Sequence, residues 1–129
     1  IAAEFVGRFV KERCGLPAIA LTTDTSILTA IGNDYGYDEV FRRQVEALGR
    51  KGDVLIGIST SGNSGNVVKA FEQAAKQGIT TLAFTGAKES KMSELAYVTI
   101  RVPAPVTARV QECHIMIGHI ICEAIDEDY

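Results

Sequence analysis

Four hydroxyl side chains gather in one short stretch of this 129-residue chain. The stretch reads Ser59-Thr60-Ser61-Gly62-Asn63-Ser64, and it contains neither Lys nor Arg. Neutral donors at this density suit the binding of an anion through hydrogen bonds, and Gly62 lets the backbone approach a ligand closely. The candidate donors are Ser59, Thr60, Ser61 and Ser64.

The residues on either side of this stretch predict how it is placed. The apolar run 53–57 indicates a short buried strand, and 66–77 has apolar residues at helical spacing before the stop signal Gly78. In an open parallel sheet ligands bind at the carboxyl ends of strands, and a helix N-terminus there offers free N–H groups to an anion. The simpler alternative is an ordinary helix N-cap, for which one Ser would suffice.

A second polar group lies in the apolar run from Thr107 to about Glu127, which predicts one long helix. The apolar residues cover much of its circumference, so we expect this helix to be deeply buried, against a partner subunit if not within the chain. A His in such a setting is more often a satisfied core or interface residue than a catalyst. Gln111 and His119 would lie about 12 Å apart along the axis and about 80° apart around it, so they meet at one ligand only through long side chains or as copies from two subunits. The polar residues are Arg109, Gln111, Glu112, His114 and His119.

Three further charged residues have simple interpretations. Glu4 and Arg8 are four residues apart in a predicted helix, where such a pair is a solvated salt bridge worth about 0.3–0.5 kcal/mol. Asp34 lies in the turn-forming segment 32–37, where an Asp commonly stabilises a turn.

Helical and extended patterns alternate along the chain. The pattern predicts an α/β fold, with a parallel sheet flanked by helices on both faces in a single domain. Helices are expected at 1–13, 25–31, 38–48, 66–77, 88–95 and 107–127, and strands at 18–21, 53–57, 80–84 and 97–102.

Composition excludes several classes of protein. A net charge of -3 without a Lys/Arg cluster argues against a nucleic-acid surface, and no apolar run approaches the roughly 20 residues of a membrane span. Cys14, Cys113 and Cys122 lack metal-type spacing, so we expect free thiols in a reducing compartment, the cytoplasm. The chain starts without Met inside a helical pattern, and we expect a segment upstream of Ile1.

The serine stretch after a strand, together with Arg109-Val110-Gln111-Glu112-x-His114 and His119, resembles the sugar isomerase (SIS) family and, within it, the bacterial phosphoheptose isomerases. The resemblance extends over nearly the whole chain, through AAEFVGR at 2–8, PAIAL at 17–21, GNDYGY at 32–37, GDVLIGISTSGNS at 52–64 and residues 110–119.

This resemblance implies a nucleotide-binding-like, three-layer fold of the SIS type, a homotetramer with active sites between subunits, and an aldose–ketose isomerase. The implied reaction converts sedoheptulose 7-phosphate to a D-glycero-D-manno-heptose 7-phosphate, a precursor of activated heptose. Proton transfer between C1 and C2 suits a carboxylate and an imidazole.

The resemblance also implies roles for single residues. Glu4 and His119 match the acid/base pair, and Ser59, Thr60, Ser61 and Ser64 match the phosphate-binding loop. Arg8, Asp34 and Gln111 match positions near the sugar. In members that bind zinc, Glu4, Gln111 and His119 match three ligands, and zinc there would polarise the substrate carbonyl.

Two related classes of protein remain as alternatives. One is the SIS protein that binds the bacterial replication initiator, which tends to carry Ser, Arg and Asn where this chain has Glu4, Ser61 and His119. The other is a sugar-phosphate-sensing SIS domain, which needs neither Glu4 nor His119 to bind phosphate. The chain departs from many phosphoheptose isomerases at Ala108, where some have Asp, and near Glu89-Ser90, where many have Gly-Gly.

Overall fold

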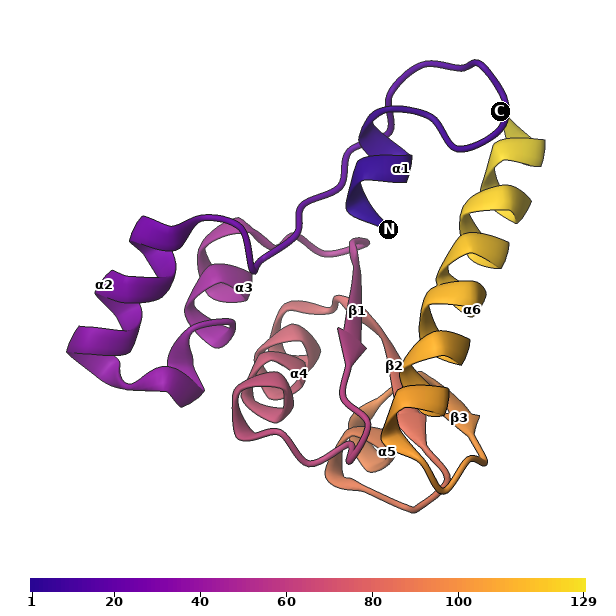
Figure 1. Cartoon of the computed structure of the whole chain (residues 1–129). Helices are drawn as coiled ribbons and strands as arrows, with labels where there is room; N and C mark the ends of the chain where they lie inside the picture. Colours follow the sequence, from indigo (N-terminus) through magenta and orange to yellow (C-terminus); the bar gives the residue numbers. More distant parts are fainter.

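A three-stranded parallel sheet forms the centre of the computed structural model, which describes all residues from 1 to 129 (Figure 1). The strands follow the order β1 (Val54–Ile58), β2 (Thr80–Gly86) and β3 (Val98–Val102). In the register, Ile56 lies opposite Leu82, and Leu82 lies opposite Val98. The three predicted strands in this half of the chain are therefore confirmed, with β2 two residues longer than expected.

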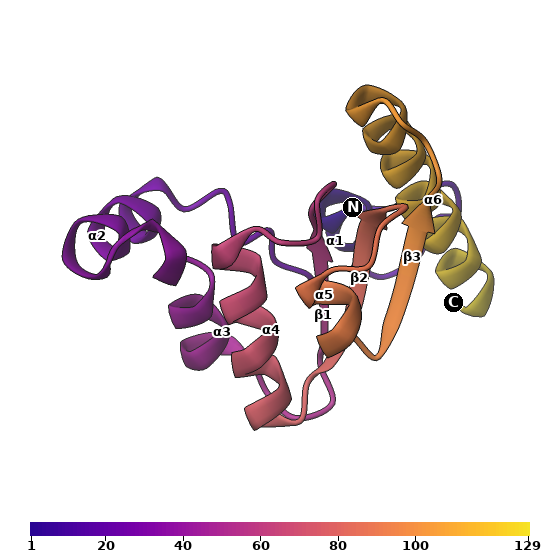
Figure 2. The same cartoon turned by 90° about the horizontal axis from the view of Figure 1, so that it is seen from below.

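Helices cover both faces of the sheet and make three layers (Figure 2). On one face lie α4 (Gly65–Gln77) and α5 (Lys91–Leu95), and on the other lies α6 (Thr107–Asp128). The buried cluster under α4 and α5 consists of Val68, Phe71, Ala83 and Met92. The prediction of an α/β fold with a parallel sheet between helices is confirmed.

A pair of helices extends beyond the sheet next to α4. After Asp24, whose carboxylate accepts a hydrogen bond from the Ile27 amide, α2 runs through Thr25–Tyr35. A short 3₁₀ helix, η1 (Tyr37–Glu39), then leads to α3 (Arg42–Leu48), which packs on α4. The predicted helix at 25–31 was thus too short, because α2 continues through most of the expected loop at 32–37. The predicted helix at 38–48 was too long at its start, because η1 and a turn precede α3.

The first helix is much shorter than the sequence predicted. Helix α1 (Ala2–Val6) ends at Gly7, and residues 8–13 are not helical. The Arg13 side chain folds back and donates hydrogen bonds to the carbonyl groups of Glu4 and Phe5. These bonds satisfy carbonyl groups at the end of α1 that a longer helix would have bonded along its own backbone.

The strand predicted at 18–21 is absent. These residues pair with no strand, and β1 keeps one edge without a neighbour. The carbonyl group of Leu21 instead accepts a hydrogen bond from the side chain of Gln44 on α3. The apolar pattern of this segment resembled a strand, but an isolated segment cannot form a hydrogen-bond ladder.

A single stripe of buried residues runs along α6, spaced four residues apart. Toward the amino end of α6 the stripe faces the sheet, where the His114 ring lies beside Phe84. Further along the helix it faces α1, where Gly118 lies against Ile1. The rest of α6 is largely open, with Ile115, Met116 and Ile120 about half exposed. One chain alone does not bury α6 deeply, and the expected burial against a partner subunit stays a prediction. The stripe comprises Val110, His114, Gly118, Cys122 and Asp126.

Candidate functional site

Hydroxyl groups of the serine loop, which we define as residues 59–64, are hydrogen-bonded to one another. The Oγ of Ser59 lies 2.8 Å from that of Ser64 and 3.4 Å from that of Ser61, and it accepts a hydrogen bond from the Gly62 amide. Ser59 is buried at the centre of this arrangement, whereas Ser61 is exposed. The loop thus presents its hydroxyl groups as one connected set at the carboxyl end of β1.

Contacts with β2 and α5 fix the backbone of the loop. The Gly86 amide donates to the Thr60 carbonyl, and the Met92 amide donates to the Gly62 carbonyl, both at 3.0 Å. Gly62 has a φ of +66°, and a Cβ there would lie 2.2 Å from the Ser90 Oγ. No other residue type fits this position without strain, so Gly62 sets the shape of the loop.

Backbone N–H groups at the end of the loop remain without an acceptor. Ser64 is the N-cap residue of α4, but its hydroxyl group contacts Ser59 and caps no amide. The ordinary N-cap interpretation therefore does not account for the Ser64 side chain. Free amides at a helix N-terminus attract an anion. The loop and first-turn N–H groups that donate to no acceptor within the chain belong to Thr60, Ser61, Ser64, Gly65 and Asn66.

One carboxylate lies close to these free amides. A Cβ on Gly65 would lie 3.0 Å from both carboxylate oxygens of Asp38, so the absence of a side chain at Gly65 allows Asp38 to approach the start of α4. The negative charge of Asp38 therefore lies at the positive end of the α4 dipole, where an anionic ligand would also be attracted.

The predicted acid/base pair lies elsewhere, at the contact between α1 and α6. We call this contact the α1–α6 junction. Ile1 packs on Gly118, and the ring of Phe9 lies 5.4 Å from that of His119. Burial raises the pKa of the Cys122 thiol on α6. Glu4 lies one helical turn after Ile1 on α1, and His119 directly follows Gly118 on α6, so Glu4 and His119 belong to the same junction.

A buried ion pair that the sequence did not indicate closes this junction. Arg13 Nε donates to Asp126 Oδ1 at 2.7 Å, and the two side chains are 3% and 4% exposed. Asp126 Oδ2 also accepts from the amides of Val10 and Lys11. These hydrogen bonds lower the pKa of Asp126, led by the one from the Lys11 amide. The only signal was Asp126 itself, an acidic residue directly after the apolar part of α6, and its partner is 113 residues away.

The remaining predicted site residues do not converge. Arg8 pairs with Glu12 at 3.4 Å, so the expected Glu4–Arg8 salt bridge is wrong. Asp34 is exposed near the end of α2, where it accepts from the Asn33 side chain, so it is not the turn residue we expected. Gln111 is exposed on α6.

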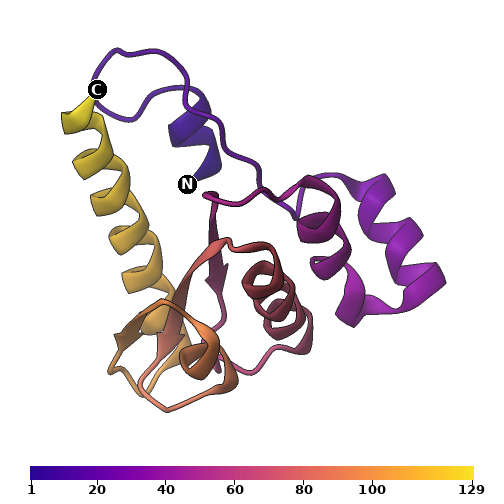
Figure 3. The ribbon, with the colours of Figure 1, turned by 180° about the vertical axis from the view of Figure 1, so that it is seen from behind.

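The serine loop and the α1–α6 junction lie at opposite ends of the sheet. Helix α1 lies near the amino end of β1, whereas the loop follows its carboxyl end (Figures 1 and 3). The five residues of β1 alone span about 16 Å. One chain therefore holds the hydroxyl groups and the pair Glu4–His119 at separate places.

His114 belongs to the core of the fold. It is 2% exposed, and its Nε2 lies 3.0 Å from the Thr85 carbonyl oxygen on β2. The expectation that a His on this helix is a satisfied core residue fits His114 at Nε2, although its Nδ1 has no partner. His119, by contrast, is exposed.

The predicted zinc site, with ligands Glu4, Gln111 and His119, stays a prediction. No three His, Cys, Asp or Glu side chains converge to hold a metal ion. Gln111 precedes His119 by eight residues, which is about 12 Å along α6. Only Glu4 and His119, a carboxylate and an imidazole of the kind that zinc accepts, share one location.

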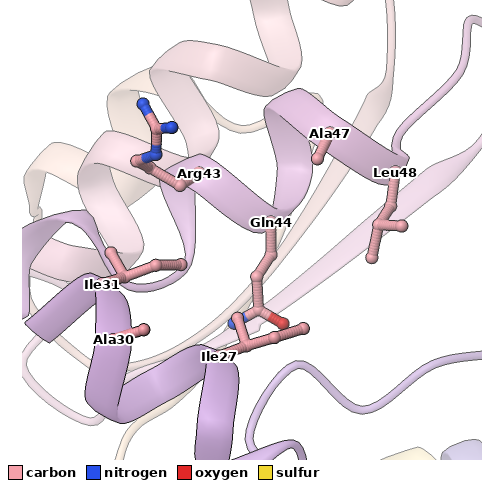
Figure 4. Close-up of a pocket in the computed structure, with 7 residues that line it drawn as sticks. All are labelled: Ile27, Ala30, Ile31, Arg43, Gln44, Ala47 and Leu48. Atoms are coloured by element: carbon pink, nitrogen blue, oxygen red, sulfur yellow. The ribbon is translucent and has the colours of Figure 1, made fainter.

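A hollow of about 330 Å³ lies between α2 and α3, away from all of these residues (Figure 4). Its lining is mostly apolar, and Gln44 within it already donates to the Leu21 and Val40 carbonyls. The Arg43 guanidinium stacks on the ring of Tyr35. No predicted site residue lines the hollow.

Comparison with known proteins gives a consistent result. The sequence model of the SIS domain matches residues 1–86. The chain belongs to the SIS domain family. It is 60% identical to the phosphoheptose isomerases of Aquifex aeolicus and Nitratiruptor, over 98% and 100% of this chain and 66% and 69% of those proteins. The chain therefore spans about two thirds of the length of these relatives.

Solved structures agree with the sequence comparison. The chain matches the phosphoheptose isomerase of Neisseria gonorrhoeae with a TM-score of 0.90 and 51% identity, over 98% of this chain and 67% of that one. It matches the enzyme of Francisella tularensis with a TM-score of 0.93 and 38% identity, over 98% and 68%. None of the helices is long and apolar enough to span a membrane.

Proposed function

We propose that this SIS domain catalyses the aldose–ketose isomerisation of sedoheptulose 7-phosphate to D-glycero-D-manno-heptose 7-phosphate, in the synthesis of activated heptose. The observation that carries the proposal is the serine loop, whose hydroxyl groups adjoin free amides at the start of α4. The relatives named above are phosphoheptose isomerases at up to 60% identity, which supports the choice of substrate.

The loop has the chemistry to bind the phosphate group of the substrate. Its hydroxyl groups and amides supply neutral donors, and the dipole of α4 adds a positive end. Because β2 and α5 hold the loop backbone, the donors are already in place before the ligand arrives. In this proposal the loop fixes one end of the sugar phosphate and performs no proton transfer.

Glu4 and His119 carry the chemical step in the proposal. The Glu4 carboxylate removes the proton at one of the carbons C1 and C2 and returns it to the other. The His119 imidazole holds or delivers a proton at the carbonyl oxygen. Each positioned proton transfer typically contributes about 10²–10⁴-fold in rate.

The active site is proposed to form between copies of the chain in a homo-oligomer, which we expect to be a tetramer. The support is the separation of the loop from the junction, since one copy does not bring Glu4 and His119 to its own loop (Figure 3). The half-exposed Ile115, Met116 and Ile120 on α6 offer an apolar face for such an assembly. Sedimentation of the full-length protein at micromolar concentration should show the oligomer, and a monomer would contradict it.

Mixing two inactive variants tests whether the site is shared. Full-length Ser59→Ala/Ser61→Ala protein and full-length His119→Gln protein are each expected to have little activity. When the two are unfolded together and refolded, sites that combine an intact loop with an intact His119 should restore a fraction of the wild-type rate. No recovery in mixed oligomers would place both groups of one site on the same chain.

We also propose that zinc binds in the assembled protein, with Glu4 and His119 among its ligands and Gln111 contributed from another copy. Zinc bound there would polarise the substrate carbonyl. Isothermal titration of metal-free protein with zinc should show binding that His119→Gln weakens. Equal zinc binding by both proteins would remove His119 from the ligand set. The proposed location is the cytoplasm, supported by three cysteines that form no disulfide.

A solvent-exchange assay tests the isomerase proposal. The full-length protein is supplied with sedoheptulose 7-phosphate in D₂O, and heptose 7-phosphate and the deuterium at C1 and C2 are measured. We expect product formation with exchange at these carbons. Binding of the sugar phosphate without turnover or exchange would leave a sensing domain. Absence of binding would favour the class that binds another protein.

A further inference from the structure

Arg13 contacts both partners of the α1–α6 junction through one guanidinium group. Its Nε donates to Asp126 on α6, at 2.7 Å. One terminal nitrogen donates to the carbonyls of Phe5 and Cys14, both at 3.0 Å, and the other donates to the carbonyl of Glu4 at 2.9 Å. The carbonyl groups of Glu4 and Phe5 lie in the last turn of α1.

Asp126 completes the connection from the other side. Its second oxygen accepts from the amides of Val10 and Lys11, at 2.8 and 2.9 Å, in the segment that follows α1. The segment that leaves α1 is thereby bonded directly to one carboxylate near the end of α6, and α1 itself is connected to that carboxylate through Arg13. Few other contacts hold α1, since none of its residues is buried.

Global stability alone is a weak explanation for such a pair. Removing two charged groups from water costs free energy, and well-packed apolar residues often replace a buried ion pair at no loss. An Arg fork does, however, fix orientation, because its donors lie in one plane at set angles. The hydrogen bonds at this fork determine where the backbone of Glu4 lies relative to α6, and hence relative to His119.

We propose that Arg13 and Asp126 are positioning residues that hold Glu4 at the working distance from His119. This inference rests on the proposed isomerase function, in which Glu4 and His119 transfer protons. Neither Arg13 nor Asp126 touches the substrate in this proposal. Their effect is exerted through the backbone of α1.

The variant Arg13→Lys tests the proposal in the full-length protein. Lys keeps the positive charge for Asp126, but a single ammonium group cannot also reach the carbonyls of Glu4, Phe5 and Cys14. We expect kcat to fall about tenfold or more while KM changes less than twofold. The control is Arg50→Lys, since Arg50 likewise donates to carbonyls at the end of a helix, those of Ala47 in α3 and of its C-cap residue Gly49, but far from the junction. Arg50→Lys should keep wild-type kcat and KM.

A double-mutant cycle separates positioning from general destabilisation. If Arg13 acts through Glu4, adding Arg13→Lys to Glu4→Gln should leave the residual kcat unchanged within about twofold. If Arg13 only stabilises the fold, the two losses in kcat should multiply, and this result would overturn the proposal. An unchanged kcat in Arg13→Lys alone would also overturn it. All rates are measured well below the midpoint of thermal unfolding of each variant.

Hydrogen exchange keeps this test independent of the proposed reaction. A wild-type protein that does not turn over sugar phosphate would refute the isomerase function, and the positioning of α1 would then be judged from amide exchange. Arg13→Lys should speed exchange in residues 1–13 by at least tenfold and leave α4 at the wild-type rate. Equal acceleration throughout the chain, or no change in residues 1–13, would refute the positioning role.

Discussion

The serine loop and the α1–α6 junction are held together in different ways. Every hydrogen bond that fixes the loop comes from within residues 59–92, and most of them involve the backbone. The junction depends on two side chains, Arg13 and Asp126, that are 113 residues apart. The proposed phosphate site is therefore built from a local motif, whereas the placement of the proposed proton-transfer pair depends on an ion pair between residues that are distant in the sequence.

The junction should carry the largest effect on the rate. Glu4→Gln keeps the size of the side chain but removes its basicity, so kcat of the full-length protein should fall by about 10² or more while KM stays within about twofold. His119→Gln should behave similarly. Steady-state kinetics provide the measurement, and Glu123→Gln, an exposed carboxylate on the same helix, serves as control. Full activity in both site variants would place the chemistry on other residues.

The loop should affect binding more than the chemical step. Ser59→Ala/Ser61→Ala removes two hydroxyl groups from the proposed phosphate site, and KM should rise by about tenfold or more because each lost hydrogen bond to a charged group costs about 1.5–3 kcal/mol. The circular dichroism spectrum should match wild type, and Ser26→Ala, an exposed residue of α2, should leave KM unchanged. A KM close to wild type in the double variant would contradict the assignment of the phosphate site.

Acid should weaken the junction in a way that depends on Asp126. Hydrogen bonds from Lys11, Val10 and Arg13 hold the pKa of Asp126 below its ordinary value of 3.8. The depressed pKa means that the carboxylate stabilises the fold above pH 3.8 and that this contribution is lost as the pH falls through the folded-state pKa.

Urea unfolding from pH 6 downwards measures this effect. Below pH 3.8 the free energy of unfolding should decline more steeply in wild type than in Asp126→Asn, which cannot titrate at this position. Two other carboxylates with lowered pKa are present in both proteins. The pKa of Glu39 is lowered to about 2 by hydrogen bonds from Arg42 and Lys69, and that of Glu89 is lowered by hydrogen bonds from Arg101 and Ser93. Parallel curves for the two proteins would show that Asp126 contributes no linked stability.

The smallest expected effect concerns the carboxylate beside the loop. Asp38 lies against Gly65 at the positive end of α4, where its charge opposes an incoming phosphate. Asp38→Asn should lower KM by about two- to fivefold, the range that a charge at a helix terminus contributes. The reduction should shrink at high ionic strength. A raised KM would instead indicate that Asp38 contacts the sugar.

The sequence predicted the sheet, the flanking helices and the serine loop, because each depends on local signals. Apolar periodicity and the stop signal Gly78 defined α4 to within one residue. The sequence also predicted that hydroxyl groups would gather at a helix N-terminus, as they do around Ser59. These features need no knowledge of what lies elsewhere in the chain.

The features that the sequence did not predict depend on contacts between residues that are distant in the chain. The helical pattern of residues 8–13 gave no sign that Arg13 would fold back onto α1. The strand pattern at 18–21 carries no information on whether a neighbouring strand is present, and the structure has none beside it. Most importantly, spacing alone could not show that Glu4 and the serine loop occupy opposite ends of the sheet.

The four-residue spacing of the buried stripe on α6 sets the direction in which each buried side chain points around the helix axis. A helix turns about 100° per residue, so a four-residue step advances about 40° beyond a full turn, and the stripe winds about 160° around α6 between Val110 and Asp126. Because of this winding, His114 faces the sheet and Asp126 faces Arg13. Inserting one Ala between them would rotate Asp126 by about 100° and leave His114 in place. The number of residues in this interval is therefore as much a part of the junction as the side chains themselves.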